Sequence, residues 1–219
     1  MIFQKVVKGI SGIDPAAAKD IIDKGLKSNW YRMAGTILEE DKKIHLTAKN
    51  LDLHLNHYHK NVPVANPLSL IHKGKFGDVS PFISTTAGVV QRNEAERKNI
   101  IFSSYMTALR FATSNFKKSG FIFYTYVITV GKKAVEMEQF AEDIRNLNVY
   151  KEFQQYNSQG EVMAKIIIPS VQIEKAEMYV GTEVIKQMRS RVPIVPKLVF
   201  QNSDYQAPEQ FSNIHDMIL

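Results

Sequence analysis

The stretch FIFYTYVITV, residues 121–130, decides the class of fold. Apolar and aromatic residues stand at both odd and even positions, which predicts a strand that is buried on both faces. Such a strand lies inside a sheet, with a neighbouring strand on each side and cover above and below. The rest of the chain therefore has to supply further strands and the helices that cover them.

Helices are predicted mainly in the first half of the chain and strands mainly in the second. The predicted helices are 14–29, 47–61 and 103–120, with Asp14, Thr47 and Ser103 or Ser104 as N-caps. The predicted strands besides 121–130 are 29–37, 82–88, 161–169 and 172–180, and residues 136–160 are expected to form a short helix and a polar loop. This order indicates an α+β fold with a mixed, mostly antiparallel sheet, because a doubly wound fold would alternate strands with helices.

Composition narrows the class of protein. A chain of 219 residues with 44% hydrophobic residues is long and apolar enough for one domain, expected over residues 1–199, with a polar tail over 200–219 that wraps the domain or is disordered. The absence of cysteine excludes disulfides and thiol nucleophiles. No apolar run is long enough for a membrane span or a cleavable secretory signal. The net charge of +6 is ordinary for solubility, and no arginine-rich tract indicates a nucleic-acid partner.

Three short patterns at predicted strand ends carry chemistry only as a set. They are an arginine in WYRMAG (Arg32), the Ser-Thr-Thr sequence of FISTTAG (residues 84–86), and a glutamate in QGEV (Glu161). Each is common alone, since an arginine or a glutamate at a strand end is usually solvated and hydroxyl residues are frequent in strands. Their meaning depends on whether the fold brings the strand ends together.

In this order, and with an aromatic residue and Gln159 before the glutamate, the set resembles the Arg–Ser–Glu class of bacterial mono-ADP-ribosyltransferase toxins. This class includes cholera-toxin-like, clostridial binary and Rho-modifying enzymes. The resemblance covers roughly residues 28–181 and includes the strand–Ile-Pro–strand ending GEVMAKIIIPSVQIEKAEMYVG. It implies the ADP-ribosyltransferase fold, a mostly antiparallel split β-sandwich with flanking helices. It also implies NAD as co-substrate, without a metal.

The resemblance assigns roles to individual residues. Glu161 is the candidate catalytic carboxylate, which stabilises the oxocarbenium-like ribose formed when the nicotinamide bond breaks. Ser84 is expected to hydrogen-bond Glu161 and fix its rotamer. Arg32 is expected to bind the pyrophosphate through its planar fork. The cofactor-binding set is completed by Tyr31, Thr85 and Thr86.

Gln159 and Tyr156 precede the catalytic strand, where the resembled enzymes meet their acceptor. Glutamine two residues before the catalytic glutamate resembles the enzymes that modify asparagine or glutamine of Rho-type GTPases, and also guanine-modifying relatives. Its amide both donates and accepts, so it can orient another neutral amide. The expected partner is therefore a host protein, either a Rho-type GTPase or another cytoskeletal regulator such as actin. The expected location is the host cytoplasm, after secretion or injection by a bacterium.

Other interpretations remain open at this stage. The scaffold could serve an NAD glycohydrolase with water as acceptor, or a non-catalytic basic binding module. The histidines of HLNHYH (His54, His57 and His59) are interpreted as surface and packing residues, because no carboxylate set or HExxH pattern accompanies them. KGKFGD, residues 73–78, is interpreted as a turn, because it lacks the spacing of a phosphate-binding loop.

Overall fold

The structure is a computed structural model that describes residues 2–34, 42, 44–62, 64–65, 71–72, 74–88, 104–146, 148–153 and 159–208. The helices are α1 (Pro15–Lys24), α2 (Asn29–Ala34), α4 (Ala48–Asn56), α5 (Ser104–Ala112) and α7 (Gly181–Arg189), with 3-10 turns η1 (Phe76–Val79), η2 (Lys151–Phe153) and η3 (Ser170–Gln172). The strands are β1 (Ile2–Ser11), β2 (Leu26–Lys27), β3 (Val64–Ala65), β4 (Ile71–His72), β5 (Phe82–Thr86), β6 (Ser119–Thr129), β7 (Glu142–Asp143), β8 (Glu161–Lys165), β9 (Ile167–Ile168), β10 (Ile173–Val180) and β11 (Leu198–Gln201). The expected α+β class is confirmed.

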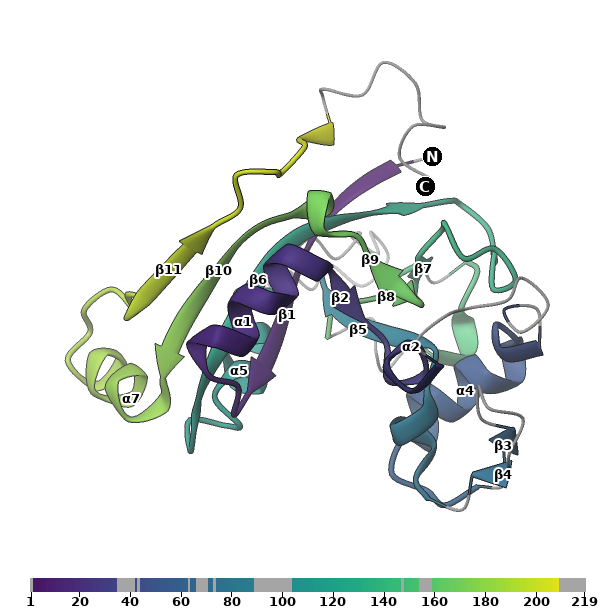
Figure 1. The fold of residues 1–219 in the computed structure, drawn as a ribbon. Coiled ribbons are helices and arrows are strands. Elements are labelled where there is room, and N and C mark those ends of the chain that lie inside the picture. The colour runs from purple at the N-terminus through teal and green to yellow at the C-terminus, as the bar shows by residue number, and fades with distance from the viewer. Residues whose placement is uncertain are drawn as a thin grey trace.

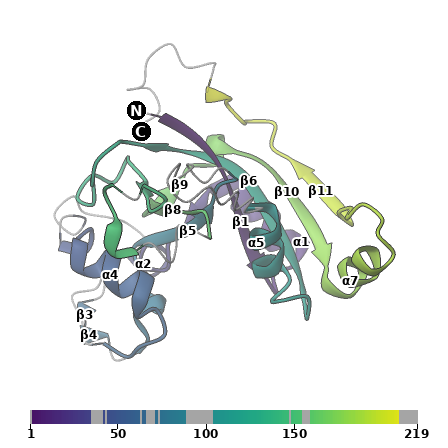
Figure 2. The ribbon, with the colours of Figure 1, turned by 180° about the vertical axis from the view of Figure 1, so that it is seen from behind.

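A seven-stranded sheet in the order β11-β10-β6-β1-β5-β8-β7 organises the molecule, and its strand ladders are antiparallel. Helices α1 and α5 cover opposite faces of its β10-β6-β1 part (Figures 1 and 2). Helices α2 and α4 lie at the other end of the molecule from α7 and β11 in both views. In the described part of the chain, no helix is both long and apolar enough to cross a membrane.

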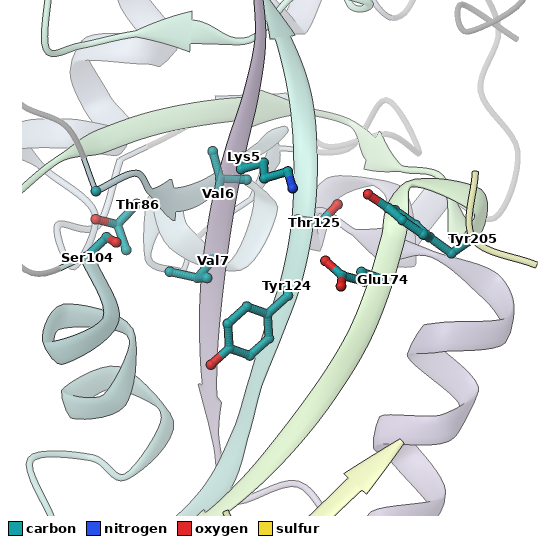
Figure 3. A pocket seen from close by; sticks show the side chains of 10 residues that line it. Lys5, Val6, Val7, Thr86, Ser104, Tyr124, Thr125, Glu174 and Tyr205 are labelled. Carbon is teal, nitrogen blue, oxygen red and sulfur yellow. The ribbon is translucent and has the colours of Figure 1, made fainter. Parts of the chain in front are cut away.

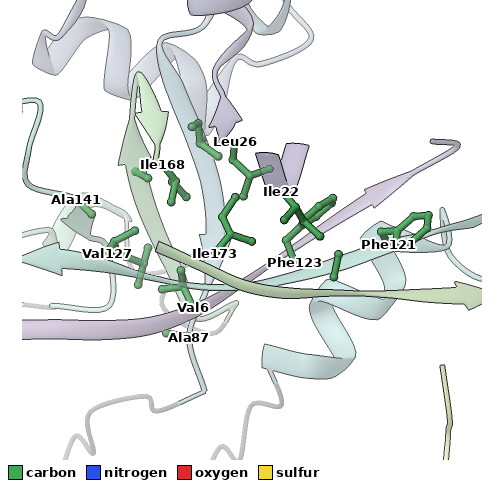
Figure 4. Close-up of a cluster of buried hydrophobic side chains, with 14 of the residues drawn as sticks. Val6, Ile22, Leu26, Ala87, Phe121, Phe123, Val127, Ala141, Ile168 and Ile173 are labelled. Atoms are coloured by element: carbon green, nitrogen blue, oxygen red, sulfur yellow. The ribbon is translucent and has the colours of Figure 1, made fainter. Parts of the chain in front are cut away.

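The apolar stretch that decided the fold class forms β6, which is buried along both faces as predicted. On one face, Phe123 and neighbouring side chains pack against Ile22 of α1 (Figure 4). On the other face, Ile122 packs against Leu109 of α5. The sheet and its two helices therefore form a rigid base for the residues at the ends of the neighbouring strands.

Strand β1 was not predicted, although it pairs with β6 over its whole length from Ile2 to Ser11. Its sequence, IFQKVVKGIS, lacks a clean apolar alternation because Lys5, Lys8 and Gly9 interrupt it. Gly9 permits α5 to lie directly on the strand, since a Cβ there would stand 2.0 Å from the carbonyl oxygen of Ala108. The strand is thus specified by its neighbours more than by its own pattern.

The predicted strand 29–37 is wrong over its described part, because residues 29–34 form helix α2. The Ser28 hydroxyl accepts a hydrogen bond from the backbone N–H of Tyr31 at 3.1 Å, as an N-cap does. Trp30 is completely buried in an apolar cluster with Leu51, Phe82 and Met163. The aromatic pair that favoured a strand is therefore accommodated by tertiary burial of one helical face.

Two further predictions need correction. The predicted strand 161–169 is broken at Ile166, whose φ of 61° is left-handed, so that β9 leaves the main sheet and pairs with β2. A β-branched residue in this conformation is strained and is retained here by burial and by hydrogen bonds with Pro81 and Ser28. The short helix expected within 136–160 is absent from the residues described there, which form turns, β7 and η2.

The start of the C-terminal tail belongs to the sheet. Strand β11 pairs with β10, and the ring of Phe200 stacks on Phe121 with centroids 5.9 Å apart. Farther along, the N–H of Gln206 donates to the carbonyl oxygen of Val171 at 2.8 Å. Residues 200–208 thus wrap along the domain, while residues 209–219 lie outside the described part of the chain.

Candidate active site

The pairing of β5 with β8 brings three of the predicted site residues together. In this antiparallel ladder Thr86 is opposite Glu161 and Ser84 is opposite Met163. Because side chains alternate along a strand, Ser84, Thr86 and Glu161 share one face. Glu161 is the first residue of β8 and follows Gly160, whose φ of 66° makes the turn into the strand. The register therefore places Ser84 on the same face as Glu161 and diagonally across the ladder from it.

The carboxylate of Glu161 is withdrawn from water and incompletely paired. Its Oε1 atom is buried and has no hydrogen-bond partner among the described residues. Burial raises the pKa of Glu161, while a hydrogen bond from Ser84 and the positive charge of Lys8 lower it and offset part of that shift. A buried carboxylate oxygen without a donor is costly for a folded protein, so this atom is a natural acceptor for a ligand hydroxyl.

Behind Ser84 lies His54 of α4, which the sequence analysis interpreted only as a packing residue. Its Nε2 lies 2.9 Å from the Ser84 hydroxyl and its Nδ1 lies 2.5 Å from the Ser80 hydroxyl. The ring packs edge-on against Phe82 and Tyr58, with centroids 5.7 and 5.1 Å away. The apolar stripe of α4 gave a signal for its burial, because His54 lies three residues after Leu51.

The direction of these hydrogen bonds follows from the partners. Ser84 donates to Glu161, so its oxygen accepts from His54, which must carry its proton on Nε2. Nδ1 then accepts from Ser80, whose oxygen in turn accepts the N–H of Phe82 at 3.2 Å. We call this series of hydrogen bonds, from Phe82 through Ser80, His54 and Ser84 to Glu161, the relay.

The histidine of the relay is neutral. Burial, helped by the charge of Lys8, lowers the pKa of His54 to about 3. A protonated ring would donate from both nitrogens and would leave Ser80 without its acceptor. His54 therefore orients Ser84 and does not supply a positive charge to the site.

A cation on β1, which was not predicted as a strand, lies close enough to Glu161 to influence its charge. Burial lowers the pKa of Lys8, the charge of Glu161 raises it, and the charge of Arg32 lowers it further. Lys8 is thus near enough to both groups to respond to their charges. It is the second functional candidate that sequence reasoning missed, since a single lysine in a strand with a polar pattern carries no signal of its own.

Arg32 lies at the edge of this arrangement. It belongs to helix α2 instead of a strand, its side chain is exposed, and its Nε contacts the carbonyl oxygen of Lys27 at 3.4 Å. Its charge nevertheless acts on Lys8 and on Tyr58. Tyr31 is half-buried, with the ammonium of Lys27 over its ring at 5.4 Å. The cofactor-binding roles of Arg32 and Tyr31 remain predictions.

The two threonines of the Ser-Thr-Thr sequence use their hydroxyls within the protein. Thr85 donates to the carbonyl oxygen of Val162, and Thr86 donates to that of Gln159 at 2.7 Å. Together with a bond from the Ala87 N–H to the Gly160 carbonyl at 2.9 Å, they fasten the turn before Glu161 to the end of β5. Their predicted contact with a cofactor stays a prediction, whereas this fastening is a direct observation.

The two residues predicted to recognise the acceptor are Gln159, at this turn, and Tyr156, which precedes it in the sequence. Gln159 is exposed at the turn before β8, and its backbone carbonyl accepts a hydrogen bond from Thr86. Tyr156 lies outside the described residues. The predicted acceptor-recognition role of both residues therefore stays a prediction.

A shallow pocket of about 200 Å³ adjoins the site without containing it. Figure 3 shows that it extends from Thr86 across β1, at Lys5 and Val7, to Tyr124 of β6. Neither Glu161 nor Lys8 lines it. The candidate site is therefore defined by the hydrogen bonds and charges around Glu161, and this pocket is not part of it.

No group of three or more histidine, aspartate or glutamate side chains that could hold a metal ion occurs among the described residues. Of the three histidines in HLNHYH, His54 is committed to the relay. The ring of His59 packs edge-on against Tyr58 at 5.2 Å.

No protein-family model matches the chain, and no curated protein matches its sequence. Similar solved structures include one described as EcPltA, at 14% identity and a TM-score of 0.46, covering 93% of this chain and 88% of that one. A heat-labile enterotoxin double mutant is similar at 15% identity and a TM-score of 0.42, covering 92% of this chain and 63% of that one. The nicked CARDS toxin is similar at 10% identity and a TM-score of 0.37, covering 93% of this chain and 31% of that one. The chain spans less than two thirds of the last two, and likenesses this small concern the path of the chain only.

Proposed function

We propose that the protein is an NAD-dependent mono-ADP-ribosyltransferase of the bacterial toxin class, which transfers ADP-ribose to a protein side chain. The observation that carries this proposal is the carboxylate of Glu161. It is partly buried, hydrogen-bonded by Ser84 of the relay, and left with one buried oxygen that has no partner among the described residues. A purely structural carboxylate would not be kept in this state, because an unpaired buried oxygen destabilises the fold.

The residues present fit NAD as co-substrate. The free Oε1 of Glu161 is placed to accept a hydrogen bond from a ribose hydroxyl, which would satisfy an atom that the protein leaves unpaired. Lys8 and Arg32 provide positive charge beside it for the pyrophosphate. Lysine binds phosphate as a point charge, so the pair combines it with the planar fork of an arginine.

The chemistry follows from these charges. When the bond between nicotinamide and ribose breaks, its electron pair leaves with the ring nitrogen, and nicotinamide departs as a neutral molecule. The ribose is left with oxocarbenium character, which the negative charge of Glu161 stabilises. The acceptor atom then bonds to the ribose carbon and loses its proton, to Glu161 or to water. Glu161 must be ionised for the first step, so the raised pKa makes that step faster as the pH rises.

His54 contributes as a positioning residue. Because its ring is neutral with the proton on Nε2, it obliges Ser84 to donate its own proton toward Glu161. This fixes the carboxylate rotamer before the substrate arrives, and such preorganisation avoids the cost of reorienting dipoles during the reaction.

For the acceptor we propose an asparagine or glutamine side chain of a host Rho-type GTPase, or of another cytoskeletal regulator such as actin. Support comes from the neutral amide of Gln159, which is exposed two residues before Glu161 and can pair with another amide. Guanine as acceptor and simple NAD hydrolysis are the alternatives that the same turn permits. Action in the host cytoplasm after bacterial secretion or injection belongs to this proposal.

The test separates the two half-reactions. Release of nicotinamide from NAD is measured first, and transfer of radiolabelled ADP-ribose to proteins of a host-cell lysate second. Gln159→Ala is expected to retain most nicotinamide release and to lose about ten- to a hundredfold in transfer, which corresponds to one lost hydrogen bond. Glu161→Gln is the matched control that should lose both. No nicotinamide release by the wild type would overturn the enzyme proposal, and release without labelling of protein would identify a glycohydrolase.

A further inference from the structure

At the edge of the sheet remote from Glu161, α7 leads through an extended segment into β11. We call residues 188–199 the tip. It lies at the end of the molecule opposite α2 and α4 in both views (Figures 1 and 2). In the sheet order, β11 occupies one edge, while β8 with Glu161 is next to the other edge. A partner bound at the tip would therefore leave the candidate active site open.

The tip exposes an unusual concentration of apolar side chains. Between 36% and 58% of each of these residues is exposed: Met188, Val192, Val195, Leu198 and Val199. Ile194 and Phe200 turn inward at this end, against the clusters under α5 and α1 respectively. Single exposed apolar residues are normal on any surface, but several within a dozen residues mark a contact surface.

The same segment carries only positive charge. Its ionisable residues are Arg189, Arg191 and Lys197, all exposed, and none of them makes an ion pair with another described residue. Half of the net charge of +6 is thus collected on a segment without a single acidic residue. A second copy of the chain would bring like charges together, so the charge favours an anionic partner.

The backbone of the tip has a defined conformation, because a Schellman motif fixes the turn that follows α7. The N–H of Val192 donates to the carbonyl of Gln187 at 3.1 Å, and the N–H of Arg191 donates to that of Met188 at 3.2 Å. Arg191 occupies the left-handed position of this motif with a φ of 54°, where glycine is favoured. Pro193 and Pro196 then restrict the extended segment. The chain therefore retains an arginine at a position that is better suited to glycine.

We propose that the tip is a docking surface for an anionic lipid membrane. Protruding apolar side chains enter the headgroup region, and flanking arginines and lysine pair with acidic headgroups. An extended protein strand could also add to the outer edge of β11, but such a partner would contact only the strand. It would leave Met188, Val192 and the arginines of the turn unused. This inference does not depend on the proposed enzymatic function.

The experiment uses the full chain and sedimentation with sucrose-loaded vesicles, of phosphatidylcholine alone or with added phosphatidylserine. The wild type is expected to sediment with the phosphatidylserine vesicles and to be released by salt. One variant combines Val192→Ser with Val195→Ser. The other combines Arg189→Gln, Arg191→Gly and Lys197→Gln, and should bind about a hundredfold more weakly, at about fivefold per basic residue. Arg191→Gly keeps the left-handed turn, so the second variant remains folded.

Matched controls remove the same groups elsewhere. Lys19→Gln, Lys49→Gln and Lys132→Gln together lower the net charge equally on other surfaces, and Phe111→Ser removes an apolar residue of α5 that is 63% exposed. Both controls should bind as the wild type does. Failure of the wild type to sediment, or equal binding by the tip variants, would overturn the proposal. A wild-type dimer in gel filtration that the tip variants convert to a monomer would also overturn it, in favour of a second copy.

Discussion

The two ends of strand β8 each carry an ionisable side chain, one completely and one partly buried, and the two differ in how fully they are paired. At its last residue, Lys165 pairs with Glu142 of β7 at 2.6 Å, and both side chains are almost completely buried. The same ammonium donates to the backbone carbonyls of Ala134 and Met137, while Glu142 accepts the N–H of Ala134. At its first residue, Glu161 keeps an oxygen that no described residue satisfies.

The difference separates a fully paired carboxylate from an incompletely paired one. The pair formed by Lys165 and Glu142 holds the turn at residues 134–137 against the sheet. Both charged groups have hydrogen-bond partners, which is the condition under which a buried ion pair is tolerated. The carboxylate at Glu161 is held in place by Ser84 but remains incompletely paired. Burial alone does not mark a candidate active site, whereas an ionisable group that is also held in place and incompletely paired is such a candidate.

The largest expected effect is on catalysis at the first end of β8. Glu161→Gln preserves shape and removes charge, so we expect NAD cleavage to fall by about 10²–10³-fold or more. The stability measured by thermal unfolding at neutral pH should be unchanged or higher, because a carboxylate with a raised pKa is costly to ionise in the folded state. Near-normal turnover in the folded variant would remove Glu161 from the mechanism.

At the last residue of β8, where Lys165 pairs with Glu142, we expect a loss of stability without a loss of catalysis. Glu142→Gln leaves Lys165 buried without its anion and should cost about 3–5 kcal/mol of unfolding free energy in urea titrations. NAD cleavage per folded molecule should stay near the wild-type value, since the pair is remote from Glu161 along the strand. The double change Glu142→Leu with Lys165→Met is the control, and it should recover much of the lost stability. A loss of cleavage as large as that in Glu161→Gln would contradict the division of labour.

Lys8 is the cation near Glu161 at the first residue of β8, and it can be compared with Lys165, the cation at the last residue. Lys8→Met should reduce NAD cleavage by about ten- to a hundredfold, as expected for loss of a charge that contacts phosphate. It should also move the rise of activity to higher pH, because the charge of Lys8 lowers the pKa of Glu161. Lys8→Arg keeps the charge and should retain the pH profile. An unshifted profile in Lys8→Met would show that the two groups do not interact.

Thr86 tests how the turn before Glu161 is held. Thr86→Val is nearly isosteric and removes the hydroxyl that binds the Gln159 carbonyl, so transfer to protein should fall about tenfold relative to nicotinamide release. Thr86→Ser keeps the hydroxyl and should restore the ratio. Equal loss of both half-reactions in Thr86→Val would indicate that the hydroxyl contributes to NAD chemistry itself.

The smallest effect is the pH dependence of stability. His54 has a lowered pKa in the folded state, so its contribution is present above pH 6.5 and is lost as the pH falls toward about 3. Glu161 has a raised pKa, so its contribution is present below about pH 4.5 and is lost as the pH rises through the raised value. Thermal unfolding of Glu161→Gln should lose the decline at higher pH. His54→Gln should lose the opposite slope below pH 6.5.

Local patterns were sufficient for much of the fold. The caps at Asp14 and Thr47 and the doubly apolar stretch of β6 were each predicted, since helix caps and strand burial are properties of a few adjacent residues. Patterns failed where contacts distant in sequence decide the conformation. Helix α2 forms because Trp30 is buried against residues that are distant from it in the sequence. Strand β8 is separated from β9 by the strained Ile166.

The candidate site likewise contains residues that the sequence predicted and residues that it did not. Glu161 and Ser84 were singled out by the order of short motifs, and the ladder between β5 and β8 brings them together. Lys8 and His54 were missed, because one lies on a strand with an irregular pattern and the other on an ordinary amphipathic helix. Arg32 was predicted on a strand and lies on a helix at the rim.

By itself, the sequence determined the α+β class and the doubly buried strand, because each depends on chemistry within a few neighbouring residues. It singled out the glutamate at the start of β8 only through the order of three short motifs. Only the tertiary structure decided which groups surround that glutamate. The relay joins residues 54, 80, 84 and 161, and the cation comes from residue 8. Hydrogen-bond direction, desolvation and charge act over a few ångströms in space, and no local pattern records which distant residues the folded chain places within that range.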